Sequence, residues 1–501
     1  MSTVQAAQPS GRAVFQGALQ GTALYSIPLI GQRVASIFLL SIVTRVLTRD
    51  DFGMLSLLEQ VSSILNLLLC GSFSAALGYF YFRKDAERER DQVVGTAIAG
   101  SFALGALACV VCWPAMGVIG RDVFGGGAAL LYLPLVFLNM PFDFGNEAFF
   151  TWLRVEDRQA AFARISVLRI ALMVGGIGVL VGILKMHVGG YLATTLGAQV
   201  VVAGILAVYL FRRLRPSVSP ALFARMFRFS LPLGFSLIAM FVINFGDQFI
   251  LRRYRSLAEV GIYALAYRIG LGVSLAYNSF HAYWTAQVYQ ILQRDDADGV
   301  FARLLTYAAL LVSVATLVLA LTARPGLRIL VAPGFRAAAP LIPVIAAANG
   351  IRSIGEFLRN LFLAAGRPSY KAYCEWIGMA VCVALYFLLI PRFGMWGGAI
   401  ATLATFVVMG VVSVVWTYRV SRYRVEGARL LKLGGAAAAA MALYYAVPAS
   451  SLAAQLATSA LCLALFPMLL WLLRFPTAGE WAAVRSVLQR AGGRLHAADF
   501  I

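Results

Sequence analysis

Charged residues are scarce in this chain of 501 residues, at 13%, and acidic residues are the scarcest, with 22 Asp and Glu against 42 Lys and Arg. About a quarter of the residues of a soluble domain are charged. The shortage therefore excludes a water-soluble enzyme or a DNA-binding protein, and nucleic acid is not expected as a partner despite a net charge of +20. Hydrophobic residues take the place of charge, at 61% of the chain.

Residues that carry catalytic or metal chemistry are also few, since the chain has six cysteines and three histidines. Cys109 and Cys112 have C-x-x-C spacing, but no second pair and no nearby His accompany them. We therefore interpret the cysteines as small packing residues. Walker loops, zinc-ligand sets and nucleophilic triads are absent from the sequence, so we expect neither a cofactor nor a metal.

Continuous apolar runs occupy most of the chain. Each covers roughly 18 to 25 residues, the length that a helix needs to cross about 30 Å of hydrocarbon. The sequence thus predicts an all-α integral membrane protein with about fourteen transmembrane helices. The expected spans are 22–46, 53–81, 93–119, 128–151, 163–184, 188–211, 226–251, 260–290, 302–323, 339–364, 370–390, 394–418, 431–448 and 452–473. The loops between them are too short for an extramembrane catalytic domain.

Lys and Arg are unevenly distributed between the two sets of loops. An even number of spans places both termini on one side, and that side holds 26 basic residues against 11 on the other. Because basic residues favour the cytoplasmic side, we expect both termini to be cytoplasmic. The beginning of the chain lacks a signal-peptide pattern, so we interpret the first apolar run as a retained span.

The chain repeats itself with a shift of 208 or 209 residues. Matching positions include Gly53 with Gly261, Glu147 with Glu356, Arg158 with Arg367, and Gly190 with Gly398. The repeat predicts two six-helix lobes of equal orientation, the plan of a transporter that opens a cavity to alternate faces. The expected domains are a lobe in 1–215, a second lobe in 216–424, two additional transmembrane helices in 425–475, and a cytoplasmic tail in 476–501.

Ionisable residues inside the expected spans are costly, by roughly 2.5 to 3.5 kcal/mol, and usually face a bundle interior or an aqueous cavity. The candidate substrate-binding residues are Arg33, Arg169, Arg268, Arg352 and Arg359. The acidic candidates, for ion pairing or for coupling of transport, are Glu59, Asp143, Glu147, Asp247 and Glu356.

Two of these arginines, Arg33 and Arg169, have no acid three or four residues away. They either pair with an acid on another helix or remain available to a ligand, and the planar guanidinium suits phosphate. By contrast, Arg352, Glu356 and Arg359 share one helical face, so an internal ion-pair network is an equal alternative to ligand binding there.

Aromatic residues surround Arg268, with Tyr263, Tyr267 and Tyr277 within a few turns. Such rings can stack on sugars, but ordinary aromatic packing is the preferred interpretation. His281, which stands alone in its predicted span, is interpreted in the same way, as a core residue with a hydrogen-bond partner.

The hairpin Arg45-Val-Leu-Thr-Arg-Asp-Asp-Phe-Gly-Met-Leu-Ser-Leu57, followed by Gly71 and by Ala75 to Phe82, resembles the first hairpin of Wzx-type polysaccharide-transport flippases. The segments Phe229-Ser-Leu-Pro-Leu-Gly234 and Leu361 to Ser369 are similar to later parts of that family. The family belongs to the multidrug/oligosaccharidyl-lipid/polysaccharide (MOP) exporter superfamily. The resemblance covers essentially the whole chain.

That resemblance implies a flippase or exporter of polyprenyl-diphosphate-linked oligosaccharide for surface polysaccharide, such as lipopolysaccharide or exopolysaccharide. It also implies a bacterial inner membrane, with membrane lipids, a polysaccharide polymerase or glycosyltransferases as partners. A multidrug or small-molecule antiporter of the same superfamily is the alternative. An enzyme, such as a membrane polymerase or glycosyltransferase, is not expected, because such enzymes present catalytic groups on a large extramembrane loop.

Overall fold

The computed structural model describes residues 31, 35–36, 38–67, 72–82, 90–127, 129–291, 296–420, 425–447 and 449–477. Within these ranges there is no strand, and the all-α prediction is confirmed. The helices before the midpoint of the chain are α2 (Arg49–Asn66), α3 (Ser72–Tyr81), α4 (Arg90–Cys112), α5 (Met116–Asp122), α6 (Ala129–Val155), α7 (Gln159–Gly176), η3 (Ile177–Ile183), α8 (His187–Phe211) and α9 (Pro220–Tyr254).

The later helices are α10 (Leu257–Gly270), α11 (Gly272–Ile291), α12 (Ala297–Leu330), η4 (Pro333–Ala338), α13 (Ile342–Ala364), α14 (Pro368–Phe393), α15 (Met395–Val420), α16 (Gly427–Ala446) and α17 (Leu452–Leu472). One predicted span, 260–290, is interrupted, because α10 ends at Gly270 and α11 begins at Gly272. Most of span 22–46 and nearly all of the tail 476–501 lie outside the described residues.

Length and composition mark the helices as membrane-spanning. In the described part of the chain, 8 helices are long and apolar enough to cross a bilayer. All of them coincide with predicted spans. Helices α6, α9 and α13 coincide with further predicted spans and carry several of the candidate charges, among them Asp143, Asp247 and Glu356. The protein is therefore an all-α integral membrane protein.

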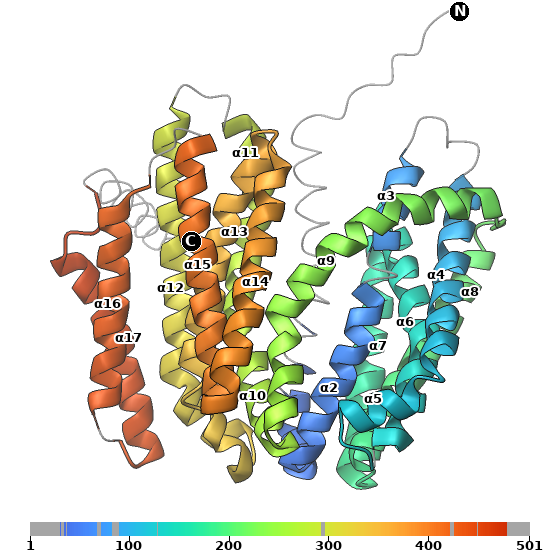
Figure 1. Ribbon diagram of the computed structural model, residues 1–501, viewed down its shortest axis with the longest axis horizontal. Coiled ribbons are helices and arrows are strands. Elements are labelled where there is room, and N and C mark those ends of the chain that lie inside the picture. The colour runs from blue at the N-terminus through green and yellow to red at the C-terminus, as the bar shows by residue number, and fades with distance from the viewer. Residues whose placement is uncertain are drawn as a thin grey trace, which may run out of the picture. The chain divides into compact units, whose positions relative to one another are not determined.

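The described residues divide into two compact units. The first unit contains the chain up to Ala264 together with Leu330–Phe335 and Val383–Gly398, and the second contains Leu265–Ile329, Arg336–Cys382 and the chain from Ala399 onwards. In the first unit α6 packs against both α4 and α8, and α9 packs against α3 and α4 (Figure 1). The predicted lobes 1–215 and 216–424 are defined by the repeat rather than by these contacts, and they stay a prediction.

The repeat is visible in where the helices end. Helices α6 and α13 end 209 residues apart, at Val155 and Ala364, and α2 and α10 begin 208 apart. The turn after α6 has Asp157 at φ 56°, and the turn after α13 has Gly366 at φ 70°. Arg158 N–H donates to Leu153 O at 2.8 Å, and Arg367 N–H donates to Phe362 O at 2.8 Å. The same hydrogen-bond pattern thus ends α6 and α13, as expected for repeated segments.

A reciprocal contact between two glycines joins α2 to α10 within the first unit. A Cβ added at Gly53 would lie 2.1 Å from Leu257 O, and one added at Gly261 would lie 2.2 Å from Arg49 O. Both positions and both carbonyls correspond under the shift of 208 residues. The crossing therefore has local two-fold symmetry, and only glycine lets the two backbones approach so closely.

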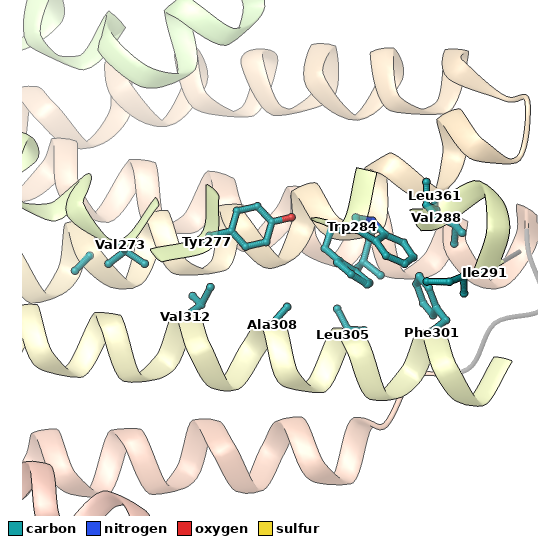
Figure 2. Packing of buried hydrophobic residues seen from close by; sticks show 13 residues of the cluster. Val273, Tyr277, Trp284, Val288, Ile291, Phe301, Leu305, Ala308, Val312 and Leu361 are labelled. Carbon is teal, nitrogen blue, oxygen red and sulfur yellow. The ribbon is translucent and has the colours of Figure 1, made fainter. Parts of the chain in front are cut away.

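Aromatic side chains form a buried cluster in the second unit, drawn in Figure 2. Trp284 stacks on Phe357 with ring centroids 4.2 Å apart, and Phe301 lies 5.3 Å from the same ring. Tyr277 also belongs to the cluster and is 3% exposed. This packing fixes α11, α12 and α13 around one core. Helices α16 and α17 pack against each other beside a second cluster that includes Leu321 of α12.

Candidate functional site

A cavity of about 390 Å³ lies within the first unit, beside α6, α7 and α8 and the helical residues that precede Leu40. On α6 the lining residues Glu147, Phe150 and Arg154 recur at helical spacing, so one face of the helix points into the cavity. The remaining polar lining residues are Ser36, Ser166, Arg169, Thr195 and Gln199. The predicted candidates Glu147 and Arg169 are therefore brought together here.

Arg169 projects from α7 into this cavity. Its guanidinium lies over the ring of Phe150, 5.9 Å from the centroid. Among the described residues no carboxylate oxygen lies within 4 Å of it. A guanidinium held on an aromatic face keeps its N–H groups available, and it can donate two parallel hydrogen bonds to one phosphate.

Glu147 is the acidic residue that α6 contributes to the lining of the cavity. It pairs with Arg154 rather than with Arg169. The distance from Arg154 Nη2 to Glu147 Oε1 is 3.2 Å, and both side chains are about half exposed, at 47% and 45%. Arg154 also donates to Thr151 Oγ1 at 2.9 Å. An ion pair this open to the cavity is weak and can exchange its partners for a ligand.

Asp143, one turn before Glu147, is held by amides. Asn66 Nδ2 donates to Asp143 Oδ2 at 2.6 Å, and Gln199 Nε2 donates to Asp143 Oδ1 at 2.7 Å. Asn146 Nδ2 in turn donates to Gln199 Oε1 at 2.8 Å. The network joins α2, α6 and α8 and fixes the amide of Gln199 at the edge of the cavity, because each oxygen of Asp143 accepts a hydrogen bond.

The other acidic candidates of the first unit lie away from this cavity's lining. Tyr191 O–H donates to Glu59 Oε1 at 2.9 Å, which joins α8 to α2. Asp247 is fully buried on α9 and accepts a hydrogen bond from Tyr263 O–H. Both acids therefore link helices. Arg33 lies outside the described residues, although Ala35 and Ser36, just after it, line the cavity.

In the second unit, charged residues of α13 form ion pairs within the protein. Arg359 Nη2 donates to Glu356 Oε2 at 2.8 Å, and Lys371 Nζ of α14 donates to Glu356 Oε1 at 2.9 Å. Arg359 is only 2% exposed. Arg352 lies over the ring of Phe406, 5.9 Å from its centroid. The arrangement of Glu356 and Arg359 is the internal network that the sequence offered as an alternative.

Arg268 is exposed on α10, whereas the tyrosines near it are buried. Tyr277 packs in the aromatic cluster of Figure 2, and Tyr263 binds Asp247. His281 lies 2.7 Å from Asn360 Nδ2, measured from its Nε2. The tyrosines and His281 thus have the packing and hydrogen-bonding roles that the sequence favoured for them.

Several polar residues of the cavity and of the adjoining network were not singled out from the sequence. Gln199, which lines the cavity, and Asn66, which binds Asp143, are uncharged, so a search for intramembrane charges passes over them. Arg154 was assigned to a loop, but α6 continues to Val155 and carries it along the cavity face. The sequence did contain a signal for this polar face of α6, because Asp143, Glu147, Phe150 and Arg154 recur at the spacing of one helical face.

Comparison with known proteins agrees with this architecture. The family model described as polysaccharide biosynthesis protein matches residues 18–283. No curated protein has a matching sequence. A structure of the lipid II flippase MurJ, in an inward closed conformation, superposes with a TM-score of 0.71 at 12% identity, covering 90% of this chain and 99% of that one.

Other solved structures share the fold. An inward-facing multidrug resistance MATE family transporter of the MOP superfamily has a TM-score of 0.67 at 16% identity, covering 80% of this chain and 98% of that one. A MOP superfamily transporter from Pyrococcus furiosus, described as having a binding pocket of reversed polarity, has a TM-score of 0.53 at 15% identity, over 80% of this chain and 95% of that one. Since the family match spans more than half of the sequence and the fold agrees along most of its length, the chain belongs to the polysaccharide biosynthesis protein family, with a MOP-superfamily fold.

Proposed function

We propose that this protein flips polyprenyl-diphosphate-linked oligosaccharide across a bacterial inner membrane for cell-surface polysaccharide synthesis. The observation that carries the proposal is Arg169, a cation without a carboxylate within 4 Å among the described residues, placed in a cavity of about 390 Å³. The family match and the fold shared with a lipid II flippase support it.

The cavity offers each part of such a head group a suitable contact. Arg169 donates to the diphosphate, because a guanidinium binds phosphate in a bidentate way. Phe162 presents an aromatic ring to a sugar face, Phe150 supports Arg169 from below, and the side chains of Thr195 and Gln199 hydrogen-bond sugar hydroxyls. The lipid tail stays in the bilayer while the head group moves through the protein.

Transport follows an alternating-access cycle, in which the lobes 1–215 and 216–424 rock about the head group. Both termini lie in the cytoplasm, where glycosyltransferases supply the loaded lipid, and a polysaccharide polymerase uses it on the other side. The protein itself performs no bond chemistry in this proposal.

The proposal is tested with purified protein in vesicles that contain a fluorescent undecaprenyl-diphosphate-linked sugar. Arg169→Gln should lower the rate of flipping about tenfold or more, since a hydrogen bond to a charged group contributes about 1.5–3 kcal/mol. Arg164→Gln is the matched control, because Arg164 is exposed on the same helix and does not line the cavity. Unchanged flipping by Arg169→Gln would contradict the assignment of this residue, and absence of flipping by the wild-type protein would contradict the function.

A second candidate is antiport of a small molecule. It is favoured by Asp143, an acid in the interior of the first unit whose two oxygens face the amides of Asn66 and Gln199. The fold shared with a MATE family transporter agrees with it. Efflux of a cationic dye by the same vesicles, driven by a proton or sodium gradient and lost in Asp143→Asn, would support antiport over lipid flipping.

A further inference from the structure

Two arginines lie one helical turn apart near the end of α12, in the second unit. Arg324 and Arg328 precede the end of this helix at Leu330, on the side opposite to the one predicted to be cytoplasmic. Arg328 Nη1 donates to Ser450 O, just before the beginning of α17, at 2.7 Å. Both arginines and the beginning of α17 therefore share one corner of the second unit, called here the α12–α17 corner.

Arg324 rests on two tyrosine rings of α16. Its guanidinium carbon lies 4.4 Å from the ring centroid of Tyr445 and 5.7 Å from that of Tyr444. In the described part of the chain its N–H groups have no hydrogen-bond acceptor, and no carboxylate oxygen lies within 4 Å of it. Stacking orients a guanidinium without using the N–H groups along its edge, so these groups can donate to an anion.

The beginning of α17 adds further donors to this corner. Ser451 Oγ accepts a hydrogen bond from Ala454 N–H at 3.1 Å. The N–H groups of Leu452 and Ala453 have no acceptor among the described residues. Because the first N–H groups of a helix carry partial positive charge, they support an anion that the two arginines hold.

Acidic residues are absent from the helices that form the corner. No Asp or Glu occurs between Asp298 and Glu356, or between Glu426 and Glu480. These stretches contain α16, α17, the turn between them, and all of α12 beyond its first turn. The charges of Arg324 and Arg328 are thus not neutralised by the segments that carry them.

The contacts between α12 and α17 show that these helices run antiparallel. The hydrogen bond to Ser450 O marks one end of their pairing. Two turns earlier on α12, Leu321 O accepts a hydrogen bond from Ser459 Oγ at 2.7 Å. The pairing between these two contacts sets Gln455 of α17 level with Arg324.

Two buried polar atoms of the second unit lack partners near this corner. Tyr444 is 2% exposed, and its hydroxyl has no hydrogen-bond partner among the described residues. Gln455 is 5% exposed, and its Oε1 has none either. Buried polar atoms are normally paired. A ligand with an anionic oxygen and a hydroxyl group suits this set, because the arginines donate and Gln455 Oε1 accepts.

Apolar side chains flank the same corner, since Ile329 is 53% exposed and Leu452 38%. Helices α12 and α17 are both long and apolar enough to cross a bilayer, so their ends at this corner reach the membrane surface. A free phosphate ion gains nothing from these apolar groups, whereas the first acyl carbons of a lipid bury surface against them.

We propose that the α12–α17 corner binds an anionic glycerophospholipid whose head group carries free hydroxyls, such as phosphatidylglycerol, from the leaflet opposite to the cytoplasm. Arg324 and Arg328 hold the phosphodiester, and a head-group hydroxyl donates to Gln455. The bound lipid joins α12 to the appended helices α16 and α17. The site lies within the second unit and does not depend on what the cavity of the first unit transports.

The test uses purified full-length protein in detergent with phosphatidylglycerol, phosphatidylmethanol or phosphatidylcholine of identical acyl chains, and native mass spectrometry to measure bound lipid. The wild-type protein should retain phosphatidylglycerol in preference to both others. Arg324→Gln combined with Arg328→Gln should weaken that binding at least about tenfold, because two charge-assisted hydrogen bonds to the phosphate are lost. Arg121→Gln combined with Arg392→Gln is the matched control, since it removes the same charge from exposed residues of the same predicted side in the first unit.

Equal loss in the two double variants would overturn the proposal, because binding would then follow net charge alone. Displacement of phosphatidylglycerol by an equal concentration of inorganic phosphate would also overturn it. Equal retention of phosphatidylglycerol and phosphatidylmethanol would contradict a hydroxyl bound to Gln455.

A second set of variants leaves the charge unchanged. Tyr445→Leu should weaken phosphatidylglycerol binding, because it removes the ring that orients Arg324, whereas Tyr445→Phe keeps the ring and should retain binding. Equal binding by the leucine and phenylalanine variants would contradict the role of the stacked arginine. Arg328→Gln alone, at an exposed side chain, provides the measurement if the double variant does not fold.

Discussion

Glu147 on α6 and Glu356 on α13 occupy equivalent positions of the repeat, yet their surroundings differ. Glu147 makes one ion pair, at 3.2 Å, and its side chain is 45% exposed in the cavity. Glu356 is 23% exposed and is bound by two cations, at 2.8 and 2.9 Å. One copy of the helix pair therefore keeps its carboxylate open to a ligand, and the other closes it within the protein.

The substitutions between the two copies explain this difference. Under the shift of 209 residues, Arg359 and Lys371 correspond to Phe150 and Phe162, whose rings lie 5.5 Å apart. Arg169 corresponds to Gly378, where an added Cβ would meet Met409 Sδ at 2.3 Å. The first copy thus has aromatic walls and a cation that projects into a cavity, whereas the second has two cations on its acid and a filled space. Divergence of a few side chains on one backbone plan made one half a candidate binding site.

We expect the largest effect from a substitution that breaks the ion-pair network of Glu356, Arg359 and Lys371. Glu356→Gln leaves Arg359, which is 2% exposed, with an uncompensated charge, and should lower the free energy of unfolding by about 3–5 kcal/mol. Glu147→Gln at the equivalent position should cost at most about 1 kcal/mol, because its pair is half exposed. Thermal or denaturant unfolding of both variants in one detergent measures the difference. Equal destabilisation would contradict the distinction drawn between the two acids.

A second prediction concerns the backbone that the two halves share. Gly53→Ala and Gly261→Ala should each lower the free energy of unfolding by about 1–3 kcal/mol, since each added Cβ would meet a carbonyl oxygen of the other helix. Their effects should be similar because the contacts are reciprocal. Gly434→Ala on α16, where no atom lies within 4 Å of the added Cβ, should be neutral or stabilising. A large effect at only one of the paired glycines would argue against the local symmetry.

A third prediction concerns a substitution that makes the surroundings of Glu147 resemble those of Glu356. Phe162→Lys places a cation at the position equivalent to Lys371, where it should pair with Glu147 and reduce the cavity. Flipping in the vesicle assay should fall about tenfold, as expected when a ligand must displace a charge-assisted hydrogen bond of about 1.5 kcal/mol. Phe162→Leu retains an apolar wall and should preserve most of the activity. Full activity of the lysine variant would show that this wall does not contact the cargo.

Hydrophobic runs predicted the helices well, because burial in a bilayer requires long continuous apolar segments with internally satisfied backbones. The beginnings of α8, α15 and α17 lie within one residue of the predicted spans. The interruption between α10 and α11 was not predicted, since a count of apolar residues passes over the two glycines, Gly270 and Gly272, on either side of Leu271. The extension of α6 to Val155 was missed because the charged Arg154 was assigned to a loop.

The candidate site was likewise predicted only in part from the sequence. The sequence by itself determined the membrane-spanning helices, the repeat and the set of intramembrane charges, because the apolar and charged positions are read directly from residue order. It could not decide which polar groups pair, because Glu356 meets Lys371 of the next helix and Asp143 meets Gln199 of a helix 56 residues further along the chain. Only the tertiary structure placed Arg169 in a cavity, and only it buried the Glu356–Arg359 pair of α13 and added Lys371 of α14 as a second cation. Burial and pairing between helices depend on the few ångströms that separate side chains of neighbouring helices.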